Sequence, residues 1–67
     1  MIIELNNRIE TLEAGQLTVN ELLELKNFTF RMLVIKINGH LVKKDQYDTA
    51  LINDGDKVMV LHLVSGG

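Results

Sequence analysis

The last three residues, Ser65-Gly66-Gly67, present the group in this chain that is best suited to chemistry. A C-terminal glycine has an unhindered carboxylate, which could attack the α-phosphate of ATP and then be attacked by sulfur at its carbonyl carbon. Glycines lack Cβ atoms, so this backbone could pass through a narrow channel, and three residues reach at most about 10 Å beyond a preceding strand. A frayed terminus is the alternative interpretation, because small flexible residues are common there.

The other residues with reactive side chains offer little to a catalytic mechanism. The chain has no cysteine, and His40 and His62 are far apart in the sequence, so neither a disulfide framework nor a metal site is expected. Asp54 and Asp56 flank a glycine, which is ordinary turn chemistry. In an extended strand Ser65 would point away from His62 and could not be activated by it. We therefore expect no metal and no enzymatic activity in this chain.

The composition predicts one small domain with an aliphatic core. The 67 residues are 46% apolar and only 4% aromatic. A net charge of −2 gives no electrostatic footprint for nucleic acid. The apolar runs are too short to span a membrane, and the first residues lack the features of a signal peptide. We expect a cytoplasmic protein that binds neither nucleic acid nor membranes.

Charges are unevenly distributed along the chain. Residues 1–25 contain five acidic side chains and one basic one, residues 26–44 contain five basic ones and no acid, and residues 45–56 contain four acids and no base. A solvated surface of mixed sign is the ordinary interpretation. Complementarity to a partner with its own charge pattern is the alternative.

The first half of the sequence predicts a hairpin followed by a helix. Residues 1–5 and 8–13 have strand patterns, and Asn6-Asn7 between them suits a tight turn. We expect Ala14-Gly15 to close this hairpin. Thr18 and Glu21 have the spacing of a capping box, which predicts a helix over residues 18–26 with one apolar face on a sheet.

The second half predicts three more strands. Residues 32–37 and 40–44 flank Asn38-Gly39, a strong hairpin-turn signal. The one-turn spacing of Tyr47 and Leu51 predicts a short helical turn over residues 45–51. A tight turn at residues 52–56 then leads into a last strand over residues 57–64. The order predicts a two-layer α+β fold, a single domain of residues 1–67 with a flexible tail at residues 65–67.

The last strand is apolar on both of its alternating faces. If Val58 and Val60 point into the core beneath the helix, then Met59, Leu61 and Leu63 point outward. A two-layer domain has no second cover for that side. The pattern indicates an apolar stripe that could dock a partner beside the tail.

Several motifs resemble those of the ThiS family, the sulfur carriers of thiamin biosynthesis, and the resemblance covers the whole chain. The matching residues are Thr18-Val19-x-Glu21-Leu22-Leu23, Ile37-Asn38-Gly39, Leu41-Val42, Tyr47, Leu51, Asp54-Gly55-Asp56-x-Val58 and Gly66-Gly67. The resemblance implies a ubiquitin-like β-grasp fold, with a mixed sheet of four to five strands and one main helix across one face.

The same resemblance implies a function for the tail. A ThiF-like, E1-like adenylating enzyme would use Mg-ATP to convert the Gly67 carboxylate to an acyl-adenylate. Sulfur from a donor such as a cysteine desulfurase would then give a Gly67 thiocarboxylate, which a ThiG-like thiazole synthase would consume. Ser65, Gly66 and Gly67 would thread into the partner's active site, and the chain itself would hold no cofactor stably.

Some residues depart from the family pattern, and two other functions stay open. Asn7 and Val34 stand where glycine and a small residue are frequent, and Lys43-Lys44 replaces the usual Pro-Arg. The departures at Val34 and Lys43-Lys44 bear on the choice of partner. The alternatives are a molybdopterin-type sulfur carrier and a ubiquitin-like module that binds partners non-covalently.

Overall fold

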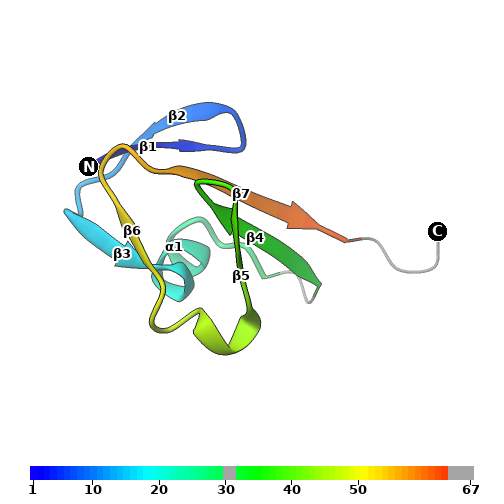
Figure 1. Ribbon diagram of the computed structural model, residues 1–67. Coiled ribbons are helices and arrows are strands. Elements are labelled where there is room, and N and C mark those ends of the chain that lie inside the picture. The colour runs from blue at the N-terminus through cyan, green and yellow to red at the C-terminus, as the bar shows by residue number, and fades with distance from the viewer. Residues whose placement is uncertain (30–31, 64–67) are drawn as a thin grey trace.

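The computed structural model describes residues 1–29 and 32–63, and its main feature is a mixed five-stranded sheet (Figure 1). The strand order is β2-β1-β7-β4-β5. Its members are β1 (Ile2–Leu5), β2 (Arg8–Thr11), β4 (Leu33–Ile37), β5 (His40–Val42) and β7 (Lys57–His62). The central strand β7 runs parallel to β1 and antiparallel to β4. The last strand of the chain therefore joins the two hairpins into one sheet.

Both predicted hairpin turns are confirmed. Asn6 and Asn7 have φ angles of 50° and 67°, and Asn38 and Gly39 have φ angles of 51° and 84°. Two consecutive residues with positive φ are characteristic of a type I′ turn, whose twist matches that of the strands it joins. Asparagine and glycine tolerate this conformation better than other residues. The turns fix the pairing of β1 with β2 and of β4 with β5.

The predicted helix is α1 (Val19–Leu25), and both of its ends are capped. The Thr18 hydroxyl accepts from the Glu21 N–H at 3.1 Å, and the Glu21 carboxylate accepts from the Thr18 N–H at 2.9 Å, which is the predicted capping box. At the other end Asn27 has a φ of 57°, and the Phe28 N–H donates to the Leu23 carbonyl at 2.8 Å. This arrangement is a Schellman motif with asparagine in the usual glycine position.

A second, two-stranded sheet corrects the predicted element order. β3 (Gln16–Thr18) pairs antiparallel with β6 (Leu51–Asn53). The chain after Ala14-Gly15 thus forms a strand before the helix begins, and Ile52 lies in a strand rather than in the predicted turn. Only Lys44–Gln46 forms the short helical segment expected over residues 45–51. Strands of three residues leave no periodic signal, and the residues they pair are more than 30 positions apart, so local patterns could not reveal them.

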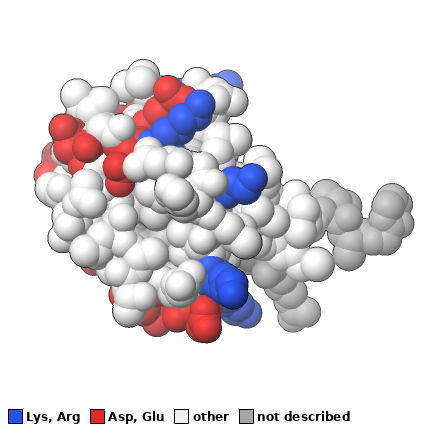
Figure 2. All heavy atoms as spheres, in the orientation of Figure 1, with Lys and Arg blue, Asp and Glu red and all other residues white. Residues whose placement is uncertain are grey.

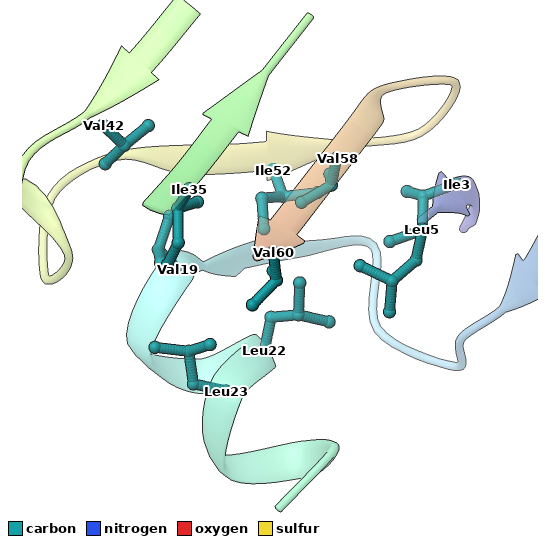
Figure 3. Packing of buried hydrophobic residues seen from close by; sticks show 10 residues of the cluster. All are labelled: Ile3, Leu5, Val19, Leu22, Leu23, Ile35, Val42, Ile52, Val58 and Val60. Atoms are coloured by element: carbon teal, nitrogen blue, oxygen red, sulfur yellow. The ribbon is translucent and has the colours of Figure 1, made fainter. Parts of the chain in front are cut away.

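The core lies between α1 and one face of the five-stranded sheet. Figure 3 shows side chains of the helix, Val19, Leu22 and Leu23, facing those of the strands. Ile35 of β4 and Val58 of β7 are each 0% exposed. The remaining buried members are Ile3, Leu5, Val42, Ile52 and Val60. The aliphatic core, the mixed sheet and the single helix confirm the predicted α+β, ubiquitin-like β-grasp fold.

One helix therefore covers one face of the main sheet, and the described chain places no element on the other face (Figure 1). Within residues 1–29 and 32–63, no helix combines the length and hydropathy needed to cross a bilayer.

Candidate functional site on the open face of the sheet

The predicted tail residues Ser65, Gly66 and Gly67 lie outside the described residues, as does Val64. The structure does describe the strand that leads to them. β7 is held on one side by β4, in a register that pairs Leu33 with His62. The Leu63 N–H donates to the Met32 carbonyl at 2.9 Å, which continues this pairing to the last described residue.

Of the three residues predicted for docking, Met59 and Leu61 alternate with the buried Val58 and Val60 along β7, and Leu63 follows the end of the strand after the exposed His62. Val58 and Val60 are 0% and 8% exposed, whereas Leu61 and Leu63 are 45% and 46% exposed. Met59 is half-buried, so it contributes less open surface than the sequence predicts. The alternation places Met59, Leu61 and Leu63 on the face of the sheet opposite α1.

The neighbouring strands widen this apolar stripe with residues that sequence reasoning did not assign to the site. Val34 of β4 pairs with Leu61, and Lys36 pairs with both Met59 of β7 and Leu41 of β5. Cross-strand partners point to the same face, so Val34 and Leu41 join the stripe. Leu41 is 58% exposed. The Asn38-Gly39 turn could have revealed this neighbour, because it sets Leu41 opposite Lys36.

We call the set Val34, Leu41, Met59, Leu61 and Leu63 the sheet patch. Figure 2, which views this face, shows blue Lys and Arg atoms on a mostly white surface, with red Asp and Glu atoms at the upper left and at the bottom. Lys36 lies within the patch by its strand pairing. Lys57 lies at the start of β7, with its Nζ 3.7 Å from the Glu4 carboxylate. The sheet patch is therefore an apolar surface with a partly basic border.

A side-chain clamp replaces strand pairing where β1 ends beside β7. The Asn6 side chain accepts from the Val60 N–H at 2.8 Å and donates from its Nδ2 to the Val60 carbonyl at 3.2 Å. The amide thus makes the two hydrogen bonds that a further β1 residue would have made. The clamp satisfies the partly buried backbone groups of Val60, next to Leu61. It fixes β7 at the point where the strand passes beyond its parallel neighbour.

Asp54 and Asp56, the two aspartates of the turn before β7, both accept hydrogen bonds from other parts of the fold. Asp54 accepts from the Ile2 N–H at 2.7 Å. Asp56 accepts from the Asn53 N–H at 2.8 Å and from the Asn38 side-chain amide at 3.0 Å. These contacts tie the turn before β7 to β1 and to the β4–β5 turn. Their role is structural, as the turn interpretation predicts.

The two histidines are separated by the length of one strand. His62 pairs with Leu33 at the start of β4, and His40 pairs with Ile37 at its end. At roughly 3.3 Å per residue, the two are about 13 Å apart along the strand direction, and they also lie on opposite sides of β4, one on β7 and the other on β5. Within the described part of the chain, no three His, Cys, Asp or Glu residues gather into a possible metal site.

Comparison with known proteins agrees with this geometry. The family model described as "ThiS family" matches residues 2–67. The curated sulfur carrier protein ThiS of Escherichia coli (strain K12) is 31% identical over 67 residues, which are 100% of both chains. The chain belongs to the ThiS family.

Solved structures of ThiS proteins share the fold. The crystal structure of the thiamine biosynthesis protein ThiS from Geobacter metallireducens has a TM-score of 0.87 and 30% identity, with 100% of both chains covered. The solution structure of a thiamine biosynthesis protein from the same organism has a TM-score of 0.76 and 27% identity, and covers 100% of this chain and 88% of that one. The ThiS resemblance and its β-grasp fold, both predicted from sequence motifs, are therefore confirmed.

Proposed function

We propose that this chain is a sulfur carrier for thiazole formation in thiamin biosynthesis, and that Gly67 carries the sulfur. The observation that carries the proposal is membership of the ThiS family over residues 2–67, with a full-length relative named as a sulfur carrier. Thiamine biosynthesis also stands in the names of the similar solved proteins, which favours this pathway over the molybdopterin-type alternative. We place the cycle in the cytoplasm.

The chemistry occurs on the carboxylate of Gly67 and in the partner's active site. A carboxylate oxygen attacks the α-phosphorus of Mg-ATP bound to a ThiF-like adenylating enzyme, and pyrophosphate leaves. The resulting acyl-adenylate is a mixed anhydride, and its carbonyl carbon is therefore electrophilic. A sulfur nucleophile at the oxidation level of hydrosulfide attacks this carbon, and AMP leaves with the bonding electrons. The product is a thiocarboxylate, which a ThiG-like thiazole synthase consumes. The carrier is a co-substrate in this cycle rather than the catalyst.

The rest of the chain presents the tail. We propose that the adenylating enzyme docks on the sheet patch, which leads along β7 toward Ser65, Gly66 and Gly67. Two features support this: Leu61 and Leu63 are large, apolar and nearly half-exposed, and no described element covers them. Apolar surface of this kind, bordered by charged residues, is typical of a protein interface. Ser65 acts as a spacer, and Gly66 leaves room for the channel.

A mass measurement tests the sulfur-carrier function. The purified chain is incubated with a ThiF-like enzyme, Mg-ATP and inorganic sulfide, so that no separate sulfur donor is needed. We expect the chain to gain the mass difference between sulfur and oxygen. Deleting Gly67 or changing Gly66→Val should abolish the gain and leave the unfolding transition unchanged, since both lie beyond β7.

The outcome that contradicts the proposal is an unchanged mass with an enzyme that converts its own cognate carrier in parallel. That result would leave the chain as a non-covalent β-grasp module. To separate the two carrier pathways, the thiocarboxylate product is supplied to thiazole synthase and to molybdopterin synthase. Sulfur transfer to the molybdopterin enzyme alone would overturn the assignment to thiamin.

A further inference from the structure

A groove lies on the helix side of the molecule, away from the sheet patch. It runs between α1 and the segment after β2, and it is lined by Thr11, Leu12, Glu13, Ala14, Leu17, Glu21, Glu24, Leu25 and Lys26. The sheet patch occupies the opposite face of the main sheet, because α1 packs on the inner one (Figure 1). The two surfaces can therefore be occupied at the same time.

The groove has an apolar floor that the described chain leaves uncovered. Leu12 and Leu17 are half-buried and pack against the core. Leu25 is 58% exposed, although it is on the same helix as the buried Leu22 and Leu23. Helix stability does not require a large apolar side chain at this exposed position, where a polar helix former would serve. The exposed leucine thus adds apolar surface that a partner could bury.

The rim of the groove is acidic. Glu13, Glu21 and Glu24 are exposed along it. The one basic side chain in the lining, Lys26, is engaged by Glu10, with its Nζ 2.7 Å from the carboxylate. Within the described residues, neither Glu13 nor Glu24 has an ion-pair partner within 4.0 Å. The N-terminal ammonium of Met1 lies close by and donates to the Leu12 and Ala14 carbonyls at 2.6 Å and 3.0 Å. The groove therefore combines an apolar floor with two glutamates that have no ion-pair partner among the described residues.

We propose that this groove is a second docking surface, which binds a segment of a partner protein in which lysine or arginine flanks an aliphatic side chain. The aliphatic side chain packs on Leu12, Leu17 and Leu25, and the basic groups face Glu13 and Glu24. Charge complementarity selects this occupant over an acidic or neutral segment, and it also speeds encounter at low salt. Such a partner could join the carrier while the sheet patch is bound.

The test uses the chain alone, so its result does not depend on the sulfur-carrier proposal. A synthetic peptide of alternating leucine and lysine is titrated into the ¹⁵N-labelled protein, and amide shifts are followed by NMR. A peptide of alternating leucine and glutamate is the charge control. We expect saturable shifts centred on the groove with the lysine peptide, weakened by added salt, and none with the glutamate peptide.

Matched variants separate groove binding from general attraction to an acidic protein. Glu24→Lys and Leu25→Asp should each weaken binding about tenfold or more. Asp45→Lys makes the same charge change outside the groove, and Leu41→Asp changes a leucine that is also 58% exposed, on the sheet patch. We expect both controls to bind the peptide as the unchanged chain does, after allowing for the altered net charge in Asp45→Lys with a salt series.

Three results would overturn the proposal. The first is an absence of saturable shifts, and the second is equal weakening by the groove variants and their controls. The third is a set of groove shifts that depend on the concentration of the chain itself without peptide, which would assign the groove to a second copy. Failure of the mass measurement, by contrast, would leave the groove proposal standing.

Discussion

Asn6 performs two tasks that no other residue type combines easily. Its backbone adopts a φ of 50° in the β1–β2 turn, and its side-chain amide pairs with both backbone groups of Val60. Glycine could adopt the positive φ, and glutamine could supply a side-chain amide. Asparagine supplies both, because its short amide reaches a neighbouring strand while its backbone tolerates the left-handed region.

The first prediction removes the clamp and keeps the turn. Asn6→Gly should lower the free energy of unfolding by about 1–2 kcal/mol, because two hydrogen bonds to partly buried backbone groups are lost. Urea denaturation measures the change, and hydrogen exchange should become faster at the Val60 amide. Asn7→Gly is the control: Asn7 has a φ of 67°, and its side chain makes no hydrogen bond within the described residues, so stability should stay equal or rise. An Asn6→Gly chain as stable as the parent would refute the role of the clamp.

A second prediction concerns Asn38, whose side chain joins two turns. It donates to the Asp56 carboxylate at 3.0 Å and accepts from the Lys57 N–H at 2.9 Å. Asn38→Asp keeps the shape but replaces the donor with a second carboxylate oxygen facing Asp56. We expect a loss of about 1–2 kcal/mol at neutral pH, measured by urea denaturation.

A salt series tests whether repulsion between carboxylates causes the stability loss in Asn38→Asp. Raised salt should recover part of the stability of Asn38→Asp, because screening weakens the repulsion between carboxylates at a solvent-exposed site. Asn7→Asp adds the same charge in the other hairpin turn, where no carboxylate is hydrogen-bonded to the substituted side chain. It should therefore lower the free energy of unfolding by less. Equal losses in the two variants would mean that Asp56 is not the cause.

At the scale of elements, α1 is too short to be stable by itself. Seven residues lie well below the length at which isolated helices persist in water. Packing of Val19, Leu22 and Leu23 supplies part of what is needed, and the capping box and Schellman motif satisfy the exposed ends. A cap therefore matters more here than in a long helix.

The third prediction tests the capping box. Thr18→Ala removes the acceptor of the Glu21 N–H and should lower the free energy of unfolding by about 1 kcal/mol. Thr18→Ser keeps the hydroxyl and should recover most of the loss. The urea midpoints of the three chains provide the measurement. An alanine variant indistinguishable from the serine variant would show that the cap contributes nothing.

Elements with local signals could be predicted from the sequence, and elements without them could not. The Asn6-Asn7 and Asn38-Gly39 turns and the Thr18–Glu21 box each depend on residues within three positions of one another. β3 and β6 instead depend on a pairing of Gln16 with Asn53 across the chain. The side-chain bond between these two residues, 2.6 Å long, is equally invisible to local patterns.

The same distinction holds for the candidate site: the part that depends on one strand could be predicted, and the parts that depend on distant segments could not. Period-two alternation placed Leu61 and Leu63 on the open face, because it needs only one strand. Val34 and Leu41 join them through strand pairings, and Asn6 reaches Val60 from 54 positions away. The groove beside α1 depends on how the segment after β2 packs against the helix. The widened sheet patch and the groove are therefore properties of the tertiary structure rather than of any one segment.

At the scale of the whole molecule, the carrier has two separate apolar surfaces of different charge. The sheet patch has lysines beside it, and the groove beside α1 has glutamates on its rim. Two such surfaces on a chain of 67 residues allow two partners to be distinguished by charge.

The fourth prediction tests the sheet patch. Leu61→Asp should weaken binding to the ThiF-like enzyme about tenfold or more, measured by titration calorimetry, because it places a charge at the centre of the apolar stripe. Leu51→Asp is the control, since Leu51 is 46% exposed and Leu61 45%. Both chains should keep a cooperative thermal transition. If Leu61→Asp unfolds the domain, or binds the enzyme as tightly as Leu51→Asp does, the docking role is wrong.

The position of β7 has a consequence for synthesis on the ribosome. The strand that lies between β1 and β4 is made after the other strands of the described residues. A nascent chain that ends before Lys57 contains two hairpins with no strand between them, and the core lacks Val58 and Val60. Folding must therefore wait until the residues of β7 have left the exit tunnel, and until then the aliphatic segments remain available to chaperones.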